Sequence, residues 1–378
     1  MTGNGASRTM TIGVDVPVRP PTPHPIVMGS GILDLLAPEL TKLGLPRNVV
    51  LISSPDIFAL HGEAVRSALT DGGYRVLDVA TFPDGEQYKN QESWLHLIAS
   101  VAGAEERCTP PVLIINLGGG VVMDVGAFVA ACFKRGRDYV HLPTTLLGDV
   151  DCGIGGKCGF NYNGKNLVGQ FYQPRLVLSD LSFLNTLEPR EIRSGIAEVI
   201  KYGAALDAEF FDYVSQHHEG LRQLDTNVVR YVAKRCFDMK VGIVEQDERD
   251  TKGIRAKLNF GHTIGHALEG ATEYLAFTHG EAIAIGMVCA CEIAEKTQGL
   301  SPEVTAKVAG LCEAVGLLTH IDHPIDLAKI MTHMQRDKKF RDGQNCFVLP
   351  NRLGEAKIQR NIDQSLIEKV ISFRMHSK

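Results

Sequence analysis

The chain lacks several features that would set it apart from ordinary soluble enzymes. No apolar run approaches the roughly 20 residues that a membrane-spanning helix needs. The first 25 residues lack the apolar h-region of a signal peptide, and Val16–Pro25 is rich in proline. The nine cysteines form no CxxC pair and their number is odd, which favours a reducing compartment over a disulfide framework. We therefore expect a cytoplasmic protein in which residues 1–25 form a loose N-terminal extension.

The chain also lacks an excess of positive charge. Its formal net charge is −5, from 39 Lys and Arg against 44 Asp and Glu, so the composition gives no reason to expect nucleic acid as a partner. At 378 residues, with 44% hydrophobic and 22% charged residues, the chain is long enough for two domains with sizeable cores. These values are typical of a globular enzyme that acts on small molecules.

The pattern of the chain changes near residue 185. Before it, short β-rich runs alternate with helical patterns, which indicates a mainly parallel sheet covered by helices. The predicted strands are Val49–Ser53, Tyr74–Thr81, Val112–Leu117, Tyr139–Pro143 and Leu176–Asp180, and the predicted helices are Ile32–Leu43, Asp56–Asp71, Gln91–Ala104 and Met123–Lys134. After it, amphipathic helices dominate apart from Cys346–Pro350. The sequence therefore predicts an α/β nucleotide-binding domain over 26–185 and a helical domain over 186–378, with the active site in the cleft between them.

Three histidines are candidate metal ligands. His262 and His266 stand four residues apart in GHTIGHALE and share one face if the segment is helical, and His279 begins HGEAIAIGM. Imidazole is a preferred zinc ligand, and a catalytic zinc site typically has three protein ligands and one open position. Glu198 in REIRSGIAEVIKYG is a candidate third ligand, with Lys201 on the same helix face. Hydrogen-bonded helix histidines are the alternative interpretation of an HxxxH pattern on its own.

Glycine-rich turns indicate a nucleotide site in the first domain. LIINLGGGVVMDVGAF predicts a buried strand, the turn Gly118–Gly120 and a helix that begins near Asp124. Glycines let the backbone approach a phosphate, and a helix N-terminus favours its charge. The fingerprint GxGxxG is absent, so tight packing alone could also explain these glycines. PDGEQYKN brings Glu86 and Lys89 to a loop suited to a ribose hydroxyl and a phosphate, and Pro143–Thr145 places two hydroxyls at a strand end.

The segment DCGIGGKCGFNYNGKNLVGQFYQP is unusually cationic for a loop. It carries Asp151, Lys157, Lys165 and Asn166 among six glycines. Lysine binds phosphate as a point charge, so the segment is a candidate anion site, with a solvated surface loop as the alternative. Further positive charge could come from Arg135, Arg255 and the pair Lys338–Lys339.

Taken together, these motifs resemble the 3-dehydroquinate synthases. DGEQYK, GGGVVMD, PTTLL, the D-x5-K of DCGIGGK, GKN, FYQP, AEVIKYG, RAKLNFGHTIGHALE, THGEA and DKK occur in that family's order, from roughly residue 30 to 360. The resemblance implies an α/β NAD-binding domain, a helical metal-binding domain and a homodimer. It also implies a zinc ion, or a cobalt ion, held by Glu198, His262 and His279.

The resemblance further implies which residues contact the cofactor and the substrate. The implied NAD contacts are Asp84, Gly85, Glu86, Lys89, Gly119, Gly120, Val121, Asp124, Thr144, Thr145, Lys157, Lys165, Phe183, Leu184 and Thr186. The residues implied to surround a sugar phosphate substrate are Arg135, Asp151, Lys157, Asn166, Lys201, Lys240, Arg255, Asn259, His266 and Lys338.

The activity implied by the resemblance is the conversion of 3-deoxy-D-arabino-heptulosonate 7-phosphate to 3-dehydroquinate and phosphate. It would proceed by transient NAD-dependent oxidation, phosphate elimination, reduction and intramolecular aldol closure. Some positions depart from the family pattern, namely the short loop NYNGKN, Cys152, Cys158 and Gly148–Asp149. Two alternatives therefore stay open: a sister sugar phosphate cyclase that makes valiolone-type or 2-deoxy-scyllo-inosose rings, and a metal-dependent NAD polyol dehydrogenase.

Overall fold

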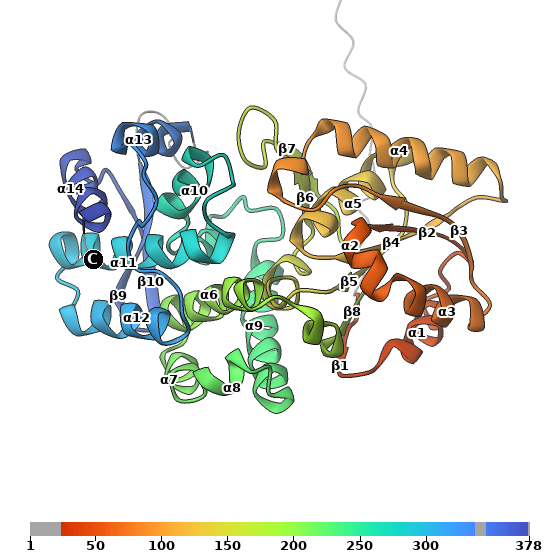
Figure 1. Ribbon diagram of the computed structural model, residues 1–378, viewed down its shortest axis with the longest axis horizontal. Helices are drawn as coiled ribbons and strands as arrows, with labels where there is room; N and C mark the ends of the chain where they lie inside the picture. Colours follow the sequence, from red (N-terminus) through yellow and green to blue (C-terminus); the bar gives the residue numbers. More distant parts are fainter. Residues whose placement is uncertain (1–23, 337–344, 377–378) are drawn as a thin grey trace, which may run out of the picture.

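The N-terminal half of the molecule is built on a six-stranded sheet. The computed structural model describes residues 24–336 and 345–376. The strand order is β1-β8-β5-β4-β2-β3, and every neighbouring pair is parallel (Figure 1). The strands are β1 (Ile26–Gly29), β2 (Asn48–Ser53), β3 (Arg75–Thr81), β4 (Leu113–Gly118), β5 (Tyr139–Pro143) and β8 (Leu176–Asp180).

Helices cover both faces of this sheet. On β2, Val50 and Ile52 belong to the core formed with α4 and α5, whereas Val49 and Leu51 belong to the core formed with α1 and α3. Side chains that alternate between two apolar faces are what a parallel sheet covered on both sides requires. The helices of this half are α1 (Leu36–Lys42), α2 (Pro55–Ile57), α3 (Glu63–Asp71), α4 (Gln91–Glu106) and α5 (Gly120–Cys132).

The sequence located the five main strands to within two residues, but it misjudged other boundaries. The helix predicted to begin near Asp124 begins at Gly120, because the last glycine of the turn already has helical geometry. It ends at Cys132 instead of Lys134, whose φ of 45° is left-handed. The predicted helix Asp56–Asp71 contains a π-helical turn, η2 (Phe58–Gly62). The short strand β1 and the antiparallel hairpin of β6 (Lys157–Phe160) and β7 (Val168–Phe171) were not predicted.

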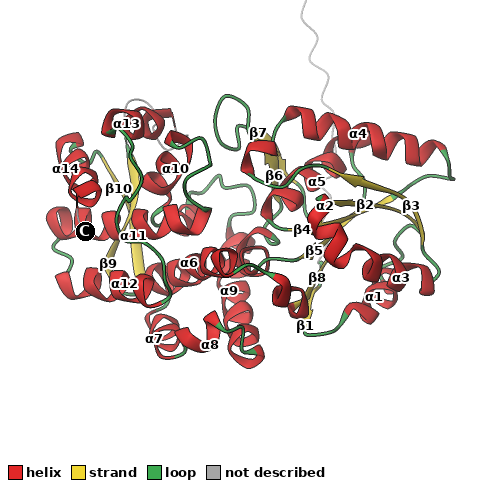
Figure 2. Cartoon of the chain, in the orientation of Figure 1, coloured by secondary structure: helices red, strands yellow, loops and turns green. Residues whose placement is uncertain are grey.

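Over the residues that the structure describes, the C-terminal half is helical apart from one antiparallel hairpin (Figure 2). The hairpin consists of β9 (Cys346–Arg352), which was predicted, and β10 (Glu355–Arg360), which was not. The helices are α6 (Pro189–Leu206), α7 (Ala208–Gln216), α8 (His218–Arg222), α9 (Thr226–Gln246), α10 (His262–Ala271), α11 (His279–Gln298), α12 (Pro302–Ala314), α13 (Leu327–Arg336) and α14 (Gln364–His376). The predicted fold class, an α/β domain followed by a helical domain, is confirmed.

Close packing of α10 against α11 fixes the start of each helix. A Cβ atom on Gly286 of α11 would lie 2.0 Å from the carbonyl oxygen of Gly261, so only glycine allows this approach. The α11 helix starts with a capping box in which the Thr278 hydroxyl accepts from the backbone N–H of Glu281, and the Glu281 carboxylate accepts from the backbone N–H of Thr278. Thus His279, like His262 on α10, is the first residue of its helix.

The two halves share part of one core. Leu146, Val150, Leu181 and Leu184 come from the α/β half but pack within the apolar core of the helical half. The predicted domain boundary after residue 185 falls inside the 3-10 helix η6 (Leu181–Thr186) and stays a prediction.

Other predictions concern the termini, the cysteines and the membrane. Most of the proposed N-terminal extension, residues 1–23, lies outside the described residues, and so do Lys338 and Lys339. All nine cysteines are free thiols in the structure. Among the described helices, none has both the length and the apolar character needed to span a bilayer.

Candidate active site

Three helices bring the predicted metal ligands together. Glu198 lies in the middle of α6, and His262 and His279 begin α10 and α11. The Oε1 atom of Glu198 is 3.6 Å from Nε2 of His262 and 3.4 Å from Nε2 of His279. One ligand atom from each residue lies within 4.8 Å of the other two. Residues separated by up to 81 positions therefore converge, as the predicted ligand set requires.

The surroundings of Glu198 fit a bound cation. The residue has no solvent exposure, and among the described residues its Oε1 atom has no hydrogen-bond partner. A buried polar atom without a partner costs free energy, which a cation at this point would recover. Nδ1 of His262 donates to the Phe260 carbonyl at 3.1 Å, so its Nε2 atom keeps a lone pair for a metal. Two imidazoles and a carboxylate are a donor set that zinc accepts.

A second group could also hold a metal, and it shares His279 with the first. His266, Glu269 and His279 offer ligand atoms within 4.8 Å of one another. However, both carboxylate oxygens of Glu269 accept hydrogen bonds from Lys165 Nζ, at 2.8 and 2.7 Å. Both oxygens of Glu269 are thus occupied, whereas Lys201 contacts only Oε2 of Glu198, so we favour the set that contains Glu198. His266 then lies beside that set, its ring centroid 5.1 Å from that of His262.

His279 stands between two carboxylates. Its Nδ1 atom is 3.1 Å from Glu269 Oε1, while its Nε2 atom faces Glu198. Burial alone would lower the pKa of His279, but the charge of Glu269 and the nearness of both carboxylates raise it to about 9. Sequence reasoning missed Glu269, although it lies in the same GHTIGHALE motif as the histidines.

Next to the metal cluster lies a network of charges around Asp151. Lys240 Nζ donates to the Asp151 carboxylate at 2.7 Å and to its backbone carbonyl at 2.6 Å. Lys201 Nζ is 3.9 Å from the same carboxylate and also donates to Oε2 of Glu198. Burial alone would raise the pKa of Asp151, but the two lysines hold it well below its ordinary value. Tyr202, which sequence reasoning missed, donates its hydroxyl to Asp151 at 2.6 Å.

Arg255 is a buried cation held mainly by backbone carbonyls. It is 1% exposed, and its Nη1 atom donates to the carbonyls of Gly155 at 3.1 Å and Glu248 at 2.7 Å. Its guanidinium carbon lies 5.3 Å from the centre of the Phe171 ring. Its Nε atom has no hydrogen-bond partner in the described part of the chain. A donor left in this state is available to an anionic ligand.

Other residues predicted to contact the substrate lie farther out or outside the described ranges. Lys157 is half exposed and pairs with Asp250 at 3.0 Å. Arg135 is exposed, has a left-handed φ of 66°, and among the described residues no hydrogen bond or ion pair joins it to Asp151. Its predicted role stays a prediction. Asn166 lies in the turn between β6 and β7, Asn259 ends the 3-10 helix η7 (Ile254–Asn259), and Lys338 is outside the described ranges.

The glycine turn after β4 lies at the point where the strand order reverses. The chain runs from β2 outward to β3, then returns to the other side of β2 with β4, so the carboxyl ends of β2 and β4 flank a switch point. A Cβ on Gly119 would lie 3.0 Å from Thr145 Cγ2, and one on Gly120 would lie 3.0 Å from Cys152 Sγ. The buried Thr144 hydroxyl has no hydrogen-bond partner among the described residues. This glycine turn has no room for side chains at Gly119 and Gly120, and its place at a helix N-terminus fits a dinucleotide phosphate.

The other predicted cofactor contacts surround this edge. Lys89 is 3% exposed and pairs with Asp124 at 2.5 Å, and Asn161 Nδ2 donates to Glu86 at 2.9 Å. The Thr145 hydroxyl accepts from the backbone N–H of Gly148 at 3.0 Å. The remaining predicted contacts are located as follows: Asp84 and Gly85 in the loop after β3, Val121 in the first turn of α5, Lys165 in the β6–β7 turn, and Phe183, Leu184 and Thr186 in η6.

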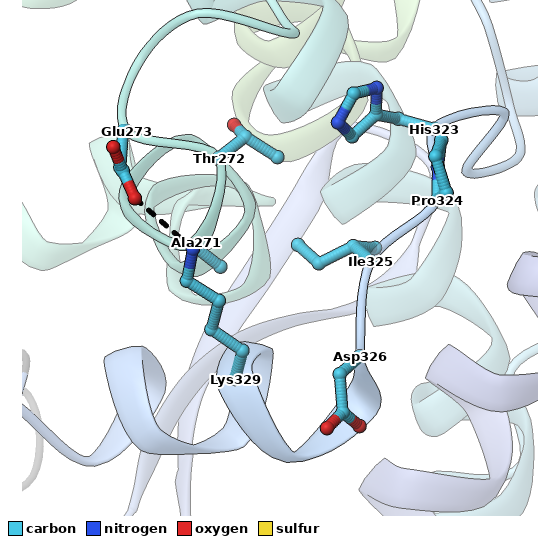
Figure 3. A pocket seen from close by; sticks show the side chains of 8 residues that line it. All are labelled: Ala271, Thr272, Glu273, His323, Pro324, Ile325, Asp326 and Lys329. Carbon is cyan, nitrogen blue, oxygen red and sulfur yellow. Dashed lines mark hydrogen bonds and ion pairs between the residues drawn. The ribbon is translucent and has the colours of Figure 1, made fainter.

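A separate cavity of about 300 Å³ lies at the opposite end of α10 from His262 (Figure 3). Its lining includes the ion pair of Glu273 with Lys329 at 3.4 Å. None of the described residues predicted for the metal, cofactor or substrate lines this cavity, so it is separate from the candidate active site.

Two family models together cover most of the chain. The model described as 3-dehydroquinate synthase N-terminal matches residues 79–194, and the one described as 3-dehydroquinate synthase C-terminal matches residues 195–340. A 3-dehydroquinate synthase from Rippkaea orientalis is 39% identical over 366 residues, which are 95% of this chain and 98% of the relative. One from Pelotomaculum thermopropionicum is 40% identical over 352 residues, or 92% and 93% of the two chains. The chain belongs to the 3-dehydroquinate synthase family.

Solved structures share the same fold. The 2-epi-5-epi-valiolone synthase ValA from Streptomyces hygroscopicus, with NAD+ and Zn2+ bound, superposes with a TM-score of 0.84 at 25% identity over 95% of this chain and 98% of that one. A 2-deoxy-scyllo-inosose synthase gives a TM-score of 0.82 at 23% identity over 93% and 96% of the two chains. Identity to these cyclases is clearly lower than to the curated 3-dehydroquinate synthases.

Proposed function

We propose that this protein converts 3-deoxy-D-arabino-heptulosonate 7-phosphate to 3-dehydroquinate and phosphate, as the family resemblance implies. The observation that carries the proposal is the unpartnered, fully buried Glu198 Oε1 between His262 and His279, directly beside the lysines that surround Asp151. A cation site next to an anion site suits a substrate that carries both hydroxyl groups and a phosphate. The curated relatives, 37–40% identical over most of their length, support the same choice.

The proposed metal ligands are Glu198, His262 and His279. A zinc ion held there would act as a Lewis acid toward the hydroxyl groups of the sugar acid. Lys201 lies between Glu198 and Asp151, so it links the metal ligands to the substrate-facing carboxylate. Because both of its partners are carboxylates, its ammonium stays charged and can orient a hydroxyl group by donation.

The proposed phosphate site consists of cations that are already fixed in place. Lys240 is 6% exposed and is held by two bonds to Asp151. Preorganised donors in a site shielded from water stabilise developing negative charge without a cost of reorganisation. Arg255, with its unpartnered Nε, is proposed to bind the carboxylate of the substrate.

The proposed cofactor is NAD, which when bound would take a hydride from the substrate and return it in the same catalytic cycle. The turn at Gly119 and Gly120 would hold its phosphates, and the unpartnered hydroxyl of Thr144 supports a polar ligand there. In this interpretation the enzyme is a carbon–oxygen lyase that depends on NAD and a metal.

A panel of sugar phosphates tests this function. The full-length protein, loaded with Zn2+ and NAD+, would be given the heptulosonate phosphate, sedoheptulose 7-phosphate and glucose 6-phosphate, with phosphate release measured and products identified by mass spectrometry. We expect the acid to be the best substrate and no net NADH to accumulate. Faster turnover of either neutral sugar would identify a sister cyclase, and NADH released in equal amount to product would identify a polyol dehydrogenase.

The family resemblance also supports a homodimer in the cytoplasm. Light scattering of the purified chain would give a mass near twice the monomer's 41.2 kDa. A monomeric mass at working concentration would refute the proposed assembly.

A further inference from the structure

Glu269 joins two parts of the proposed site that come from different halves of the molecule, the β6–β7 turn and α10. Its carboxylate accepts hydrogen bonds from Lys165 of the β6–β7 turn at 2.8 and 2.7 Å. One of these two accepting atoms, Oε1 of Glu269, also lies 3.1 Å from Nδ1 of His279, a proposed metal ligand. Lys165 and Glu269 are 104 residues apart in the chain, and their side chains are only 16% and 5% exposed. Figure 1 shows the β6–β7 turn reaching toward α10.

The contact with His279 fixes how that imidazole faces the metal site. A carboxylate can only accept, so Nδ1 of His279 carries the hydrogen and Nε2 is directed toward Glu198. Histidine ligands commonly donate their second ring nitrogen to a carboxylate, which sets the ring orientation and strengthens the ligand. Glu269 therefore acts on the metal through His279 and is a positioning residue.

The contact with Lys165 extends to the proposed dinucleotide loop. Asn161, at the base of the turn, donates from Nδ2 to Glu86 at 2.9 Å and accepts at its Oδ1 from the backbone N–H of Asn166 at 2.8 Å. The backbone N–H of Asn161 also donates to the carbonyl of Lys89 at 2.8 Å. A continuous set of hydrogen bonds thus links the loop of Glu86 and Lys89, through the turn and Glu269, to His279.

We propose that Glu269 couples dinucleotide binding to metal binding, with Lys165 as the group that changes partner. This inference rests on the proposed function, because it needs both a metal and NAD. Without the dinucleotide, the Glu269 carboxylate interacts with both Lys165 and His279, so its negative charge is divided between them. When the cofactor's phosphates engage Lys165, Glu269 interacts with His279 alone, and His279 becomes the stronger metal ligand. NAD+ then tightens Zn2+ binding, and by linkage Zn2+ tightens NAD+ binding by the same factor.

The test measures Zn2+ affinity of the full-length, metal-free protein against a chromogenic chelator, with and without saturating NAD+ and with no substrate present. In the wild type we expect NAD+ to tighten Zn2+ binding by about fivefold or more. Glu269→Gln should weaken Zn2+ binding by about 10- to 100-fold and abolish the response to NAD+. Zn2+ affinity in Glu269→Gln that stays within about twofold of the wild type would overturn the proposal.

A second variant separates coupling from a purely structural ion pair. Lys165→Met should tighten Zn2+ binding in the absence of NAD+, opposite to Glu269→Gln, and should also lose the response to NAD+. If both variants weaken Zn2+ binding alike, the pair is structural and the proposal fails. Glu273→Gln is the matched control: it removes a carboxylate that is 76% exposed just beyond the end of α10, and it should leave both affinities unchanged.

The same measurement distinguishes this inference from the proposed function. A wild-type protein that binds neither Zn2+ nor NAD+ would contradict the proposed function itself. A protein that binds both, but whose Glu269→Gln variant keeps the wild-type response to NAD+, would contradict only the coupling.

Discussion

Buried carboxylates meet opposite surroundings in two regions of the molecule. In the helical half, Glu198 pairs with Lys201 and Glu269 pairs with Lys165. Burial alone would raise the pKa of both carboxyls, but the lysines hold both pKa values below the ordinary range. In the α/β half, Asp149 is equally buried, yet it accepts only a hydrogen bond from Ser179, at 2.6 Å, among the described residues. Burial and the nearby charge of Asp180 raise the pKa of Asp149 to about 8.

The comparison shows that the partner, and not the depth of burial, decides whether a carboxyl stays charged. Burial penalises the ionised form at all three sites, and the nearby lysines reverse the sign of the pKa shift for Glu198 and Glu269. Glu198, Glu269 and Asp151 therefore stay charged where a metal and an anionic substrate are proposed to bind. Asp149 has no cation partner among the described residues, so burial leaves its pKa raised.

The largest expected effect comes from removing a ligand of the charged cluster. His262→Ala should leave Glu198 and His279 without the third donor, so we expect Zn2+ content to fall from about one per chain toward zero. Activity should fall by roughly a thousandfold, since metal catalysis supplies several kcal/mol. Metal analysis after dialysis and a phosphate-release assay measure both. His217→Ala, on the exposed surface of the same half, is the control. Full activity in a demonstrably metal-free protein would contradict the metal assignment.

The second effect concerns the uncharged carboxyl. Between its ordinary pKa and about 8, Asp149 binds one more proton in the folded than in the unfolded state. The free energy of unfolding should therefore fall as pH rises through this window, by up to about 1.4 kcal/mol per pH unit from this group. Asp149→Asn should remove that slope and be more stable than the wild type above the folded pKa. Denaturant unfolding of the wild type and of Asp149→Asn across the pH range measures this slope, with the exposed Asp56→Asn as control. If the interpretation is wrong, the free energies of unfolding of the wild type and of Asp149→Asn will change with pH in parallel.

The third effect concerns substrate choice. An unpaired buried arginine costs about 2–5 kcal/mol, so the wild type should prefer the heptulosonate phosphate over sedoheptulose 7-phosphate by roughly 30-fold or more. Arg255→Ala should remove most of this preference in kcat/KM while leaving the Zn2+ content unchanged. Lys252→Ala, an exposed cation three residues earlier, should keep it. If Arg255→Ala keeps the preference for the heptulosonate phosphate, another group recognises the carboxylate of the substrate.

The smallest effect tests the glycine turn. Gly119→Ala places a Cβ 3.0 Å from Thr145 Cγ2, which narrows the proposed phosphate cradle. We expect NAD+ affinity to fall by about tenfold, or about 1.4 kcal/mol, with Zn2+ content unchanged. Gly310→Ala on α12, where a Cβ meets no atom within 4 Å, is the matched control. Equal NAD+ affinities by calorimetry would exclude the cradle as the phosphate site.

The sequence predicted correctly those strands, and singled out those candidate ligands, that are marked by a local pattern of residues. Val49–Ser53 reads as a strand because its side chains are buried on both faces, and His262 was identified from its motif. The strands β6 and β7 were missed because they are short, rich in glycine and, in β7, only half buried. Gly120 was assigned to a turn although it begins α5, since a glycine carries no local signal for either state.

The missed site residues share one cause. Glu269 lies within a motif that was identified, but its partner Lys165 is 104 residues away, and no spacing rule connects them. Tyr202 follows Lys201 directly, yet its contact with Asp151 spans 51 residues. The sequence shows which residues are present and how apolar residues repeat locally. The pairing of charges between the two halves of the molecule depends on the complete fold.

The shared core has a consequence for how the protein can be divided. Leu146 and Val150 pack among helices of the C-terminal half, whereas β5 before them belongs to the six-stranded sheet and β6 after them to the β6–β7 hairpin. A fragment ending near residue 185 would expose these side chains to water, and its counterpart would lose the same contacts. We therefore expect heating to unfold the chain in a single cooperative transition. Two separately expressed fragments should regain structure only when mixed.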